Sequence, residues 1–389
     1  MSKVTKYQTG FIVALKRELS QYQYRGGEFV FSIGVLLLSM VTVAWIFTSG
    51  TLTNLPIAVI DNDGSSVSRT YIRMLEASPH LHIVDKLSSP AEARELLEQA
   101  SIYAFVLIPK HFTRDMKTGR QATVVAWYSR QFLTISGTIT NSLLEITETL
   151  AASAQITSLA KRGESVLAAG VNSMPVQLEL RTLFNPFQNY QYFLIAGLLP
   201  AMLQVFVMVW TVFLVGREFQ EQTGARWLAI GGNVYMAITA KVLPVFVVAS
   251  AISIGCVNWL YGVAGWPVSG SLGLLLVGWE LLIGAHIVLG VLFAGFAPNL
   301  ATALSFAVFF TAPAFAYAGI TFPQYAMPLV AQFWTYMLPI RTLLRLQIEQ
   351  TEIGTPISNS MPELLVLVVF IVVPLPFAIR RIRTRCTTS

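Results

Sequence analysis

The sequence predicts an α-helical polytopic membrane protein with six transmembrane helices and an α/β domain inserted after the first helix. Of its 389 residues, 54% are apolar and only 12% are charged, whereas charged residues make up about a quarter of an average soluble domain. The apolar residues gather in six runs, each long enough to cross a bilayer. Between the first two runs, residues 48–188 carry more charge and alternate between strand and helix patterns.

The six runs define the predicted membrane spans. They cover residues 29–47, 190–215, 235–261, 271–296, 300–320 and 364–379. A bilayer core about 30 Å thick needs roughly 20 apolar residues in a helix, because unpaired backbone amides are costly in hydrocarbon. The chain therefore divides into a first span at 29–47, an inserted domain at 48–188 and a transmembrane domain at 189–389.

Basic residues indicate how these spans are oriented. Lys and Arg stay on the cytoplasmic side of membrane helices, and here they cluster within residues 1–28 and again at 380–385. We therefore expect a multi-pass protein of the bacterial inner membrane with both termini in the cytoplasm and residues 48–188 outside. Basic clusters also occur in nucleic-acid binding, but flanking of membrane helices explains both clusters at once, and we expect no nucleic-acid partner.

Residues 1–28 form a separate cytoplasmic segment in this scheme. Within it, residues 8–25 carry apolar side chains such as Phe11 and Leu15 at helical spacing. The charged residues Lys16, Arg17 and Glu18 lie on the opposite side. This pattern predicts an amphipathic helix that lies on the inner leaflet of the lipid bilayer.

The inserted domain is predicted to be a compact α/β lobe. Strands are expected at 56–60, 81–87, 103–108 and 123–128, and helices at 65–77, from 90, at 112–117 and at 134–169. Ser89, Pro90 and Glu92 combine an N-cap, a proline at the first helical position and an acidic residue three positions after the cap. Strands that alternate with helices favour a layered α/β structure.

Residues that could carry chemistry of their own are few. A phosphate-binding P-loop needs Gly-Lys followed by Ser or Thr, and no Gly-Lys pair occurs in the chain. The sequence therefore predicts a protein that is not an enzyme, binds no cofactor and holds no metal. His80 with His82, and Asp61 with Asp63, resemble halves of metal sites. A surface pair and a tight turn are the favoured interpretations.

Three ionisable residues fall inside or beside the predicted spans. They are Glu280 and His286 in the fourth span and Lys241 in the third. Such residues are expensive in a membrane and usually face a cavity or a partner. Glu280 could be a neutral carboxyl or pair with Lys241, and a structural hydrogen bond is as good an interpretation as a role in transport.

The loop after the second span, residues 216–234, is amphipathic and could either dock a partner or simply connect two helices. At this point the chain resembles the ABC type-2 exporter permeases that have a large external lobe, over nearly its whole length. The motifs, in order, are Asn185-Pro186, Arg217-Glu218, Glu221-Gln222-Thr223-Gly224, Ala318-Gly319-Ile320-Thr321-Phe322-Pro323, Met327-Pro328 and Leu338-Pro339.

The resemblance assigns roles to two groups of residues. It implies that an ATPase-coupling loop contains Arg217, Glu218, Glu221, Thr223 and Gly224. It also implies broken, re-entrant helices on the outer side over residues 320–345, with Gly319, Phe322, Pro323, Pro328 and Pro339 as the residues that shape them. Proline interrupts a helix, and broken backbone at membrane depth is tolerated where protein or a cavity covers it.

The resemblance further implies a permease that exports a hydrophobic or amphipathic, drug- or lipid-like cargo. Its partners would be an ABC ATPase subunit, which uses the ATP, and a second permease copy in a homodimer or heterodimer. A periplasmic adaptor or membrane-fusion protein could meet the external domain. The alternative is a membrane-anchored receptor or adaptor whose external domain binds a ligand or a periplasmic partner. An ion-driven transporter is disfavoured, because it would need more intramembrane carboxylates.

Overall fold

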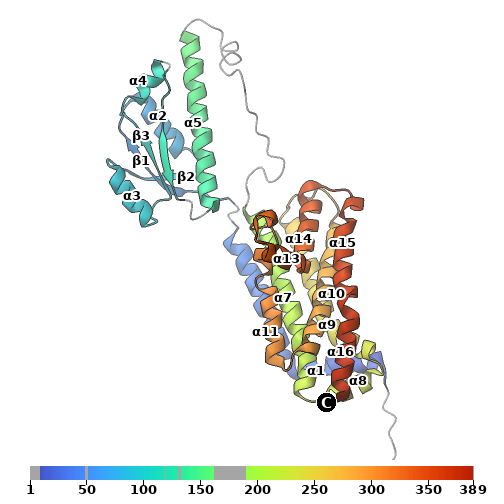
Figure 1. The fold of residues 1–389 in the computed structure, drawn as a ribbon. Coiled ribbons are helices and arrows are strands. Elements are labelled where there is room, and N and C mark those ends of the chain that lie inside the picture. Colours follow the sequence, from blue (N-terminus) through green and yellow to red (C-terminus); the bar gives the residue numbers. More distant parts are fainter. Residues whose placement is uncertain (1–8, 49–50, 119, 130–132, 162–189, 389) are drawn as a thin grey trace, which may run out of the picture. The chain divides into compact units, whose positions relative to one another are not determined.

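The computed structural model describes residues 9–48, 51–118, 120–129, 133–161 and 190–388. It divides into two compact units, a lobe of residues 51–182 and a helical unit of residues 1–50 and 183–389. Several predicted features lie outside the described residues: Asn185-Pro186, the end of the helix expected to reach residue 169, and the first eight residues. Each unit is described by itself below (Figure 1).

The lobe contains a four-stranded sheet in the order β2-β1-β3-β4. The strands are β1 Leu55–Asp61, β2 Leu81–Lys86, β3 Ala104–Ile108 and β4 Val125–Tyr128. Strand β1 pairs in parallel with β2 and β3, and β4 is antiparallel to β3. All four predicted strands are confirmed, within two residues at each end. Connections through helices explain the parallel pairs, since parallel strands need a crossover.

Helices cover both faces of the sheet. They are α2 Ser66–Glu76, α3 Pro90–Glu98, α4 Phe112–Lys117 and α5 Leu133–Lys161. Along β1, Ile57 and Val59 pack in the cluster that includes α2 and α5, whereas Ala58 and Ile60 pack in the cluster that includes α3. Successive side chains of a strand point to opposite faces, so this central strand is buried on both sides.

The turn after β1 explains the acidic pair in the sequence. The Asp61 carboxylate accepts hydrogen bonds from the backbone amides of Asp63 and Gly64, both at 3.0 Å. Asp63 accepts one from the Thr113 hydroxyl at 2.6 Å. Burial alone would raise the pKa of Asp63, but hydrogen bonds from Thr113 and Ser65 outweigh it and lower the pKa below its usual value. Both carboxylates therefore shape the turn, as the sequence predicted.

The helical unit contains six candidate membrane spans among the described residues, which confirms the predicted number. They are Gly26–Ile46, Leu194–Gln220, Val234–Val263, Leu272–Phe296, Leu300–Tyr317 and Ile357–Thr387. The sixth is the least well predicted, because it begins seven residues before residue 364 and extends past residue 379. Arginine has a high helix propensity and serine an intermediate one. The helix therefore continues past both ends of the apolar run from which it was predicted.

These spans are built from the following elements. They are α1 Phe11–Ile46, α7 Tyr190–Gln220, α9 Val234–Val257 with the π-helix η1 Asn258–Val263, α10 Leu272–Phe296, α11 Leu300–Thr311, α12 Ala314–Tyr317, α15 Ile357–Val372 and α16 Pro374–Thr388. Between them lie α8 Gly224–Gly231, the 3-10 turn η2 Gln324–Ala326, α13 Leu329–Tyr336, α14 Pro339–Ile348 and the π-helix η3 Glu349–Ile353.

Helix α10 lies at the centre of the unit, where it packs against α7, α9, α14, α15 and α16. Gly290 lets α7 approach α10, since a Cβ there would lie 2.9 Å from the Cβ of Thr211. The spans of α1, α11 and α15 bury only 22% of their apolar windows, against 67% for α7 and α10. Those three helices therefore present apolar faces to lipid or to another subunit.

Helix α1 joins two elements that the sequence treated as separate. The expected interfacial helix at 8–25 and the first span at 29–47 form one helix, Phe11–Ile46. Figure 1 shows its first part crossing the foot of the helical unit before the rest rises along it. The candidate span begins at Gly26, which is followed by Gly27, and pairs of small residues are common sites of helix bending.

Candidate functional site

A buried charge network lies at the foot of the helical unit, behind the loop of residues 216–234. It consists of Arg17 and Glu18 from α1, Glu218 from α7 and Lys241 from α9. The Lys241 ammonium lies 2.8 Å from Glu18 Oε2 and 2.8 Å from Glu218 Oε1. Lys241 and Glu18 are 1% exposed and Glu218 is 4% exposed, so these ion pairs join three helices in the interior.

Arg17 and Thr223 complete the network around Glu218. The Arg17 guanidinium donates to both Glu218 oxygens, at 2.9 and 3.1 Å, and to Glu18 at 3.1 Å. The Thr223 hydroxyl also donates to Glu218. Two cations thus balance two carboxylates, so their mutual attraction and hydrogen bonds offset the desolvation cost of burying the four charges.

A small crevice of about 50 Å³ borders the network. Tyr22, one turn after Glu18 on α1, lines it, and the Tyr22 hydroxyl is buried with no hydrogen-bond partner in the described part of the chain. Burial, and then the Glu18 carboxylate, raise the pKa of Tyr22 above its usual range. Tyr22 therefore stays a neutral hydroxyl beside the two carboxylates.

The short helix α8 is packed onto this network. Trp227 is 1% exposed, and its ring lies 5.3 Å from the Lys241 ammonium, which is the geometry of a cation–π contact. The indole nitrogen of Trp227 donates to the Ala237 carbonyl at 3.2 Å. At the other end of α8, the Ile230 carbonyl accepts from the Gly10 amide at 2.9 Å. A displacement of α8 would therefore disturb both α1 and α9.

The C-terminal helix α16 closes the other side of α8. A Cβ at Gly224 would lie 2.9 Å from the Cys386 sulfur, so the two helices pack closely at this glycine. Arg385 donates to the carbonyls of Ala294 and Pro298 at 2.8 and 2.9 Å, and it stacks 4.2 Å from the ring of Phe219. These contacts join the C-terminal ends of α10 and α7 through α16.

The acidic pair of the loop separates into an inward and an outward residue. Glu218 belongs to the buried charge network, whereas Glu221 pairs with Arg217 at 2.9 Å and its side chain is 43% exposed. The separation arises because α7 ends at Gln220 and Gln222 adopts a left-handed backbone with φ of 56°. Both carboxylates belong to the predicted ATPase-coupling loop, but only Glu221 is exposed on it, whereas Glu218 is buried.

The polar residues of the fourth span lie elsewhere. Glu280 accepts hydrogen bonds from Ser253, at 2.7 Å, and from Ser250, both on α9. The alternative in which Glu280 pairs with Lys241 is wrong, because Ser250 lies nine residues beyond Lys241 on α9, about 14 Å along a helix. His286 is fully buried, with Nδ1 2.9 Å from the Leu282 carbonyl and Nε2 unpartnered among the described residues.

The Pro-rich segment, residues 320–345, is broken as the sequence predicted. Pro328 precedes α13 and Pro339 is the first residue of α14, while Pro323 precedes η2. Gly319 has a φ of 86°, and a Cβ there would lie 2.8 Å from Gln324 Cγ, so a turn that only glycine can adopt begins the segment. Phe322 is 51% exposed. Re-entry of this segment into a membrane stays a prediction.

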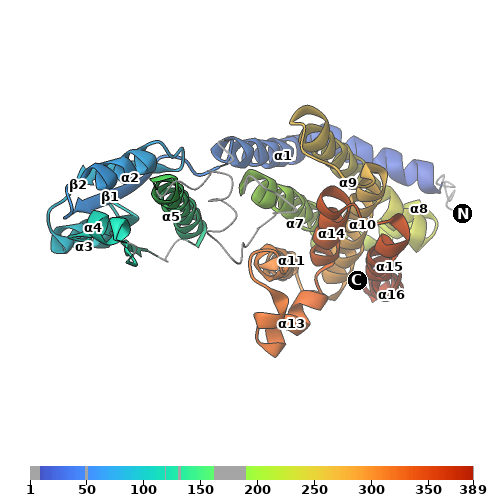
Figure 2. The same ribbon diagram turned by 90° about the horizontal axis from the view of Figure 1, so that it is seen from above.

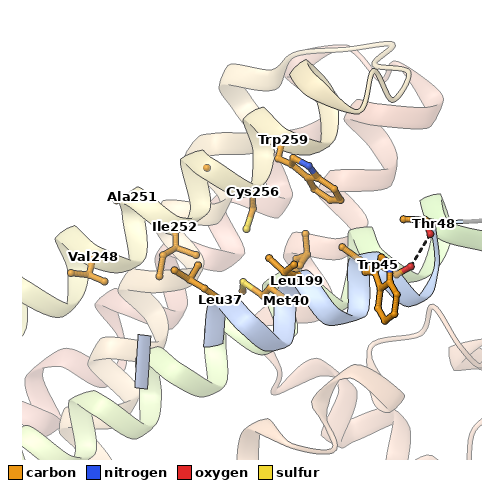
Figure 3. A pocket seen from close by; sticks show the side chains of 13 residues that line it. Leu37, Met40, Trp45, Thr48, Leu199, Val248, Ala251, Ile252, Cys256 and Trp259 are labelled. Carbon is orange, nitrogen blue, oxygen red and sulfur yellow. Dashed lines mark hydrogen bonds between the residues drawn. The ribbon is translucent and has the colours of Figure 1, made fainter. Parts of the chain in front are cut away.

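An apolar groove of about 640 Å³ runs between α1 and α9. Figure 3 shows Leu37, Met40 and Trp45 of α1 facing Ile252, Cys256 and Trp259 across it. Its walls are almost entirely hydrocarbon, with the two tryptophans toward one end. The size and the lining match sites that hold drug-sized apolar molecules.

Two members of the buried charge network were not predicted from the sequence. Arg17 and Glu18 were assigned to the polar side of an interfacial helix, which solvent or lipid headgroups would satisfy. The signal that points to them is Lys241, because an ionisable residue within an apolar span often pairs with a residue of opposite charge. Only the fold shows that α1 crosses the foot of α9 and supplies that partner.

Comparison with known proteins identifies the family. A family model described as an ABC-2 family transporter protein matches residues 28–380. The chain is similar to the probable multidrug ABC transporter permease YbhR of Escherichia coli, with 26% identity over 299 residues that cover 75% of this chain and 76% of the relative. It is also 26% identical over 318 residues to the inner membrane transport permease YhhJ of the same species, covering 78% and 77%. With the family match running through all six spans and the lobe, the chain belongs to the ABC-2 family of transporter permeases.

Proposed function

We propose that the protein is the permease subunit of an ABC exporter that moves a hydrophobic or amphipathic, drug- or lipid-like molecule out across the bacterial inner membrane. Its energy comes from ATP hydrolysed by a separate ATPase subunit. Family membership supports the permease role. The sequence contains no Gly-Lys pair, and so no P-loop, which agrees with an ATPase on a separate subunit. The names of the relatives, a multidrug permease and an inner membrane permease, support the cargo class and the location.

The buried charge network is the observation that carries this proposal. It fixes the end of α7, α1 and α9 to one another through Glu218, Lys241 and Arg17. Thr223, the N-cap of α8, donates to Glu218 and so attaches the start of α8 to the network. Packed interiors transmit displacement because they are not continuously deformable. A partner that moves the loop of residues 216–234 would therefore move the feet of three helices together, which is what coupling to an ATPase requires.

The outward surface of the same loop supplies a contact for the partner. Arg217 and Glu221 form an exposed ion pair, and Arg217 also lies 3.7 Å from Glu28. An exposed pair of mixed charge adds little stability but can direct the choice and orientation of a partner. We assign the ATPase contact to Glu221 and the transmission of movement to Glu218.

We assign the entry of cargo to the apolar groove and the contact with a second permease copy to the exposed face of α11. Figure 2 shows α1 and α9 on one side of the helical unit and α11 and α13 on the other. The groove between α1 and α9 would admit apolar cargo from the bilayer. Phe306 and Phe309 of α11 are 46% and 69% exposed, and a second permease copy would cover them. In this arrangement the lobe, outside the membrane, would meet a cargo or a periplasmic adaptor.

Charge reversal at Glu221 tests the proposed coupling surface. The permease is co-expressed with the ATPase encoded in the same operon, and copurification and ATP-dependent efflux of a lipophilic dye are measured. Glu221→Lys should abolish copurification and efflux while the thermal midpoint of the permease stays unchanged, because the side chain is exposed. The matched control is Glu145→Lys, the same reversal at an exposed position of α5 in the lobe, which should copurify normally.

The result also separates the permease from a membrane-anchored receptor. Undiminished copurification and efflux with Glu221→Lys would remove the assignment of Glu221. An unaltered protein that binds no ATPase and exports no dye would support the receptor and contradict the permease.

A further inference from the structure

A second charged cluster lies near the other end of the helical unit from the buried charge network, around α13 and α14 (Figure 1). It borders a cavity of about 510 Å³ between the residues just after α12 and the residues of α14 and η3. Two arginines, Arg341 and Arg345, share its lining with apolar side chains that include Ile320 and Ile348. We call this cavity the arginine pocket.

Arg341 is held in place but not neutralised. One of its terminal nitrogens donates to Gln324 Oε1 at 3.1 Å, and its guanidinium stacks 4.5 Å from the ring of Tyr336. The Nε atom is buried with no acceptor, and within the described ranges no carboxylate forms an ion pair with Arg341. A buried donor without an acceptor is costly. Arg341 also lines the pocket, and a guanidinium with no carboxylate partner is suited to an incoming oxyanion.

The acidic residues nearby are already engaged. Arg345 Nε lies 3.2 Å from Glu349 and 3.2 Å from Glu363, so this arginine serves two carboxylates. The Ser360 hydroxyl donates to the second oxygen of Glu349 at 2.7 Å. Glu349 lines the pocket, and Arg345 alone does not balance both carboxylates, so Arg341 offsets the remaining negative charge at longer range. Arg341 is still the cation of the pocket that no carboxylate contacts directly among the described residues.

We infer that the arginine pocket binds the phosphate or carboxylate headgroup of an anionic amphiphile, with the Arg341 guanidinium as the anion-binding group. The planar fork of arginine matches the oxygens of phosphate and carboxylate. The apolar part of the wall, with Ile320, Ile348 and Ile353, suits the first carbons of a chain attached to that headgroup. This inference goes beyond the proposed transport function, because binding needs neither ATP nor the ATPase.

Lipid retention tests the inference with the full-length permease alone. The protein is reconstituted in phosphatidylcholine nanodiscs doped with phosphatidic acid, and the lipids that stay bound after release are counted by native mass spectrometry. Arg341→Gln should lower retention of phosphatidic acid about tenfold, the loss expected for one charge-assisted contact. Arg341→Lys keeps the charge without the fork and should give an intermediate value. Arg383→Gln removes an exposed charge of α16 and should retain lipid as the unaltered protein does.

A second arm identifies the source of the anion. In nanodiscs of phosphatidylcholine alone, millimolar inorganic phosphate should fail to raise the thermal midpoint, because a free anion lacks the apolar contacts. A rise that disappears in Arg341→Gln would assign the pocket to a free oxyanion and overturn the amphiphile. Equal retention of phosphatidic acid by Arg341→Gln and the unaltered protein would overturn the site altogether. Gln324→Ala, which keeps every charge, should also reduce retention if the fork must be held in place.

Discussion

The two charged clusters of the helical unit differ in whether their charges are satisfied. In the buried charge network, Glu18 and Glu218 each contact both Arg17 and Lys241, and Lys241 is 1% exposed. At the arginine pocket, the Arg345 side chain is 59% exposed and Arg341 keeps a buried nitrogen without an acceptor. A closed cluster can hold helices together and pass on their movement, whereas an open one can accept a ligand.

Removing one charge from the buried charge network should lower the stability of the protein most severely. Lys241→Met leaves two buried carboxylates with only Arg17, and such a loss costs about 3–5 kcal/mol. We expect a large fall in the thermal midpoint and in the yield of folded protein. Lys241→Met combined with Glu218→Gln restores neutrality, since Arg17 still pairs with Glu18, and most of the stability should return. A single variant as stable as the unaltered protein would show that Lys241 is not buried in this network.

A substitution that strains the backbone beside the arginine pocket should have an intermediate effect on stability. Gly319→Ala places a Cβ at a φ of 86° and within 2.8 Å of Gln324 Cγ, which costs about 1–3 kcal/mol. Because Gln324 holds Arg341, retention of phosphatidic acid should fall as well. Gly34→Ala on α1 is the control, since a Cβ there meets nothing within 4 Å. A Gly319→Ala protein with normal stability and lipid retention would contradict the described turn.

An exposed ion pair should matter least to stability. Arg217→Gln breaks the contacts with Glu221 and Glu28, each worth at most about 1 kcal/mol at the surface. The thermal midpoint of the isolated permease should scarcely move, although its neighbour Glu218 is indispensable to the network. A fall as large as that of Lys241→Met would show that the outward pair contributes to the same network.

Local patterns were enough to predict the elements of the fold, because both strand alternation and apolar run length are properties of short segments. The lobe's strands and the number of spans came from such patterns. What Lys241 contacts could not be predicted in this way, since Glu18 lies 223 positions away in the sequence and reaches it only through the crossing of α1. The opposite directions of Glu218 and Glu221 likewise depend on where α7 ends. The unpartnered nitrogen of Arg341 depends on the packing of α14 against the turn that contains Gln324.

We propose that the buried charge network transmits the movement of the ATPase to the spans. The most direct test is the amount of cargo exported per ATP hydrolysed, in proteoliposomes of the ATPase with either the unaltered permease or the neutral double variant Lys241→Met with Glu218→Gln. The double variant should fold and still support ATP hydrolysis but export much less cargo per ATP. An unchanged ratio of cargo to ATP in that variant would contradict this proposal.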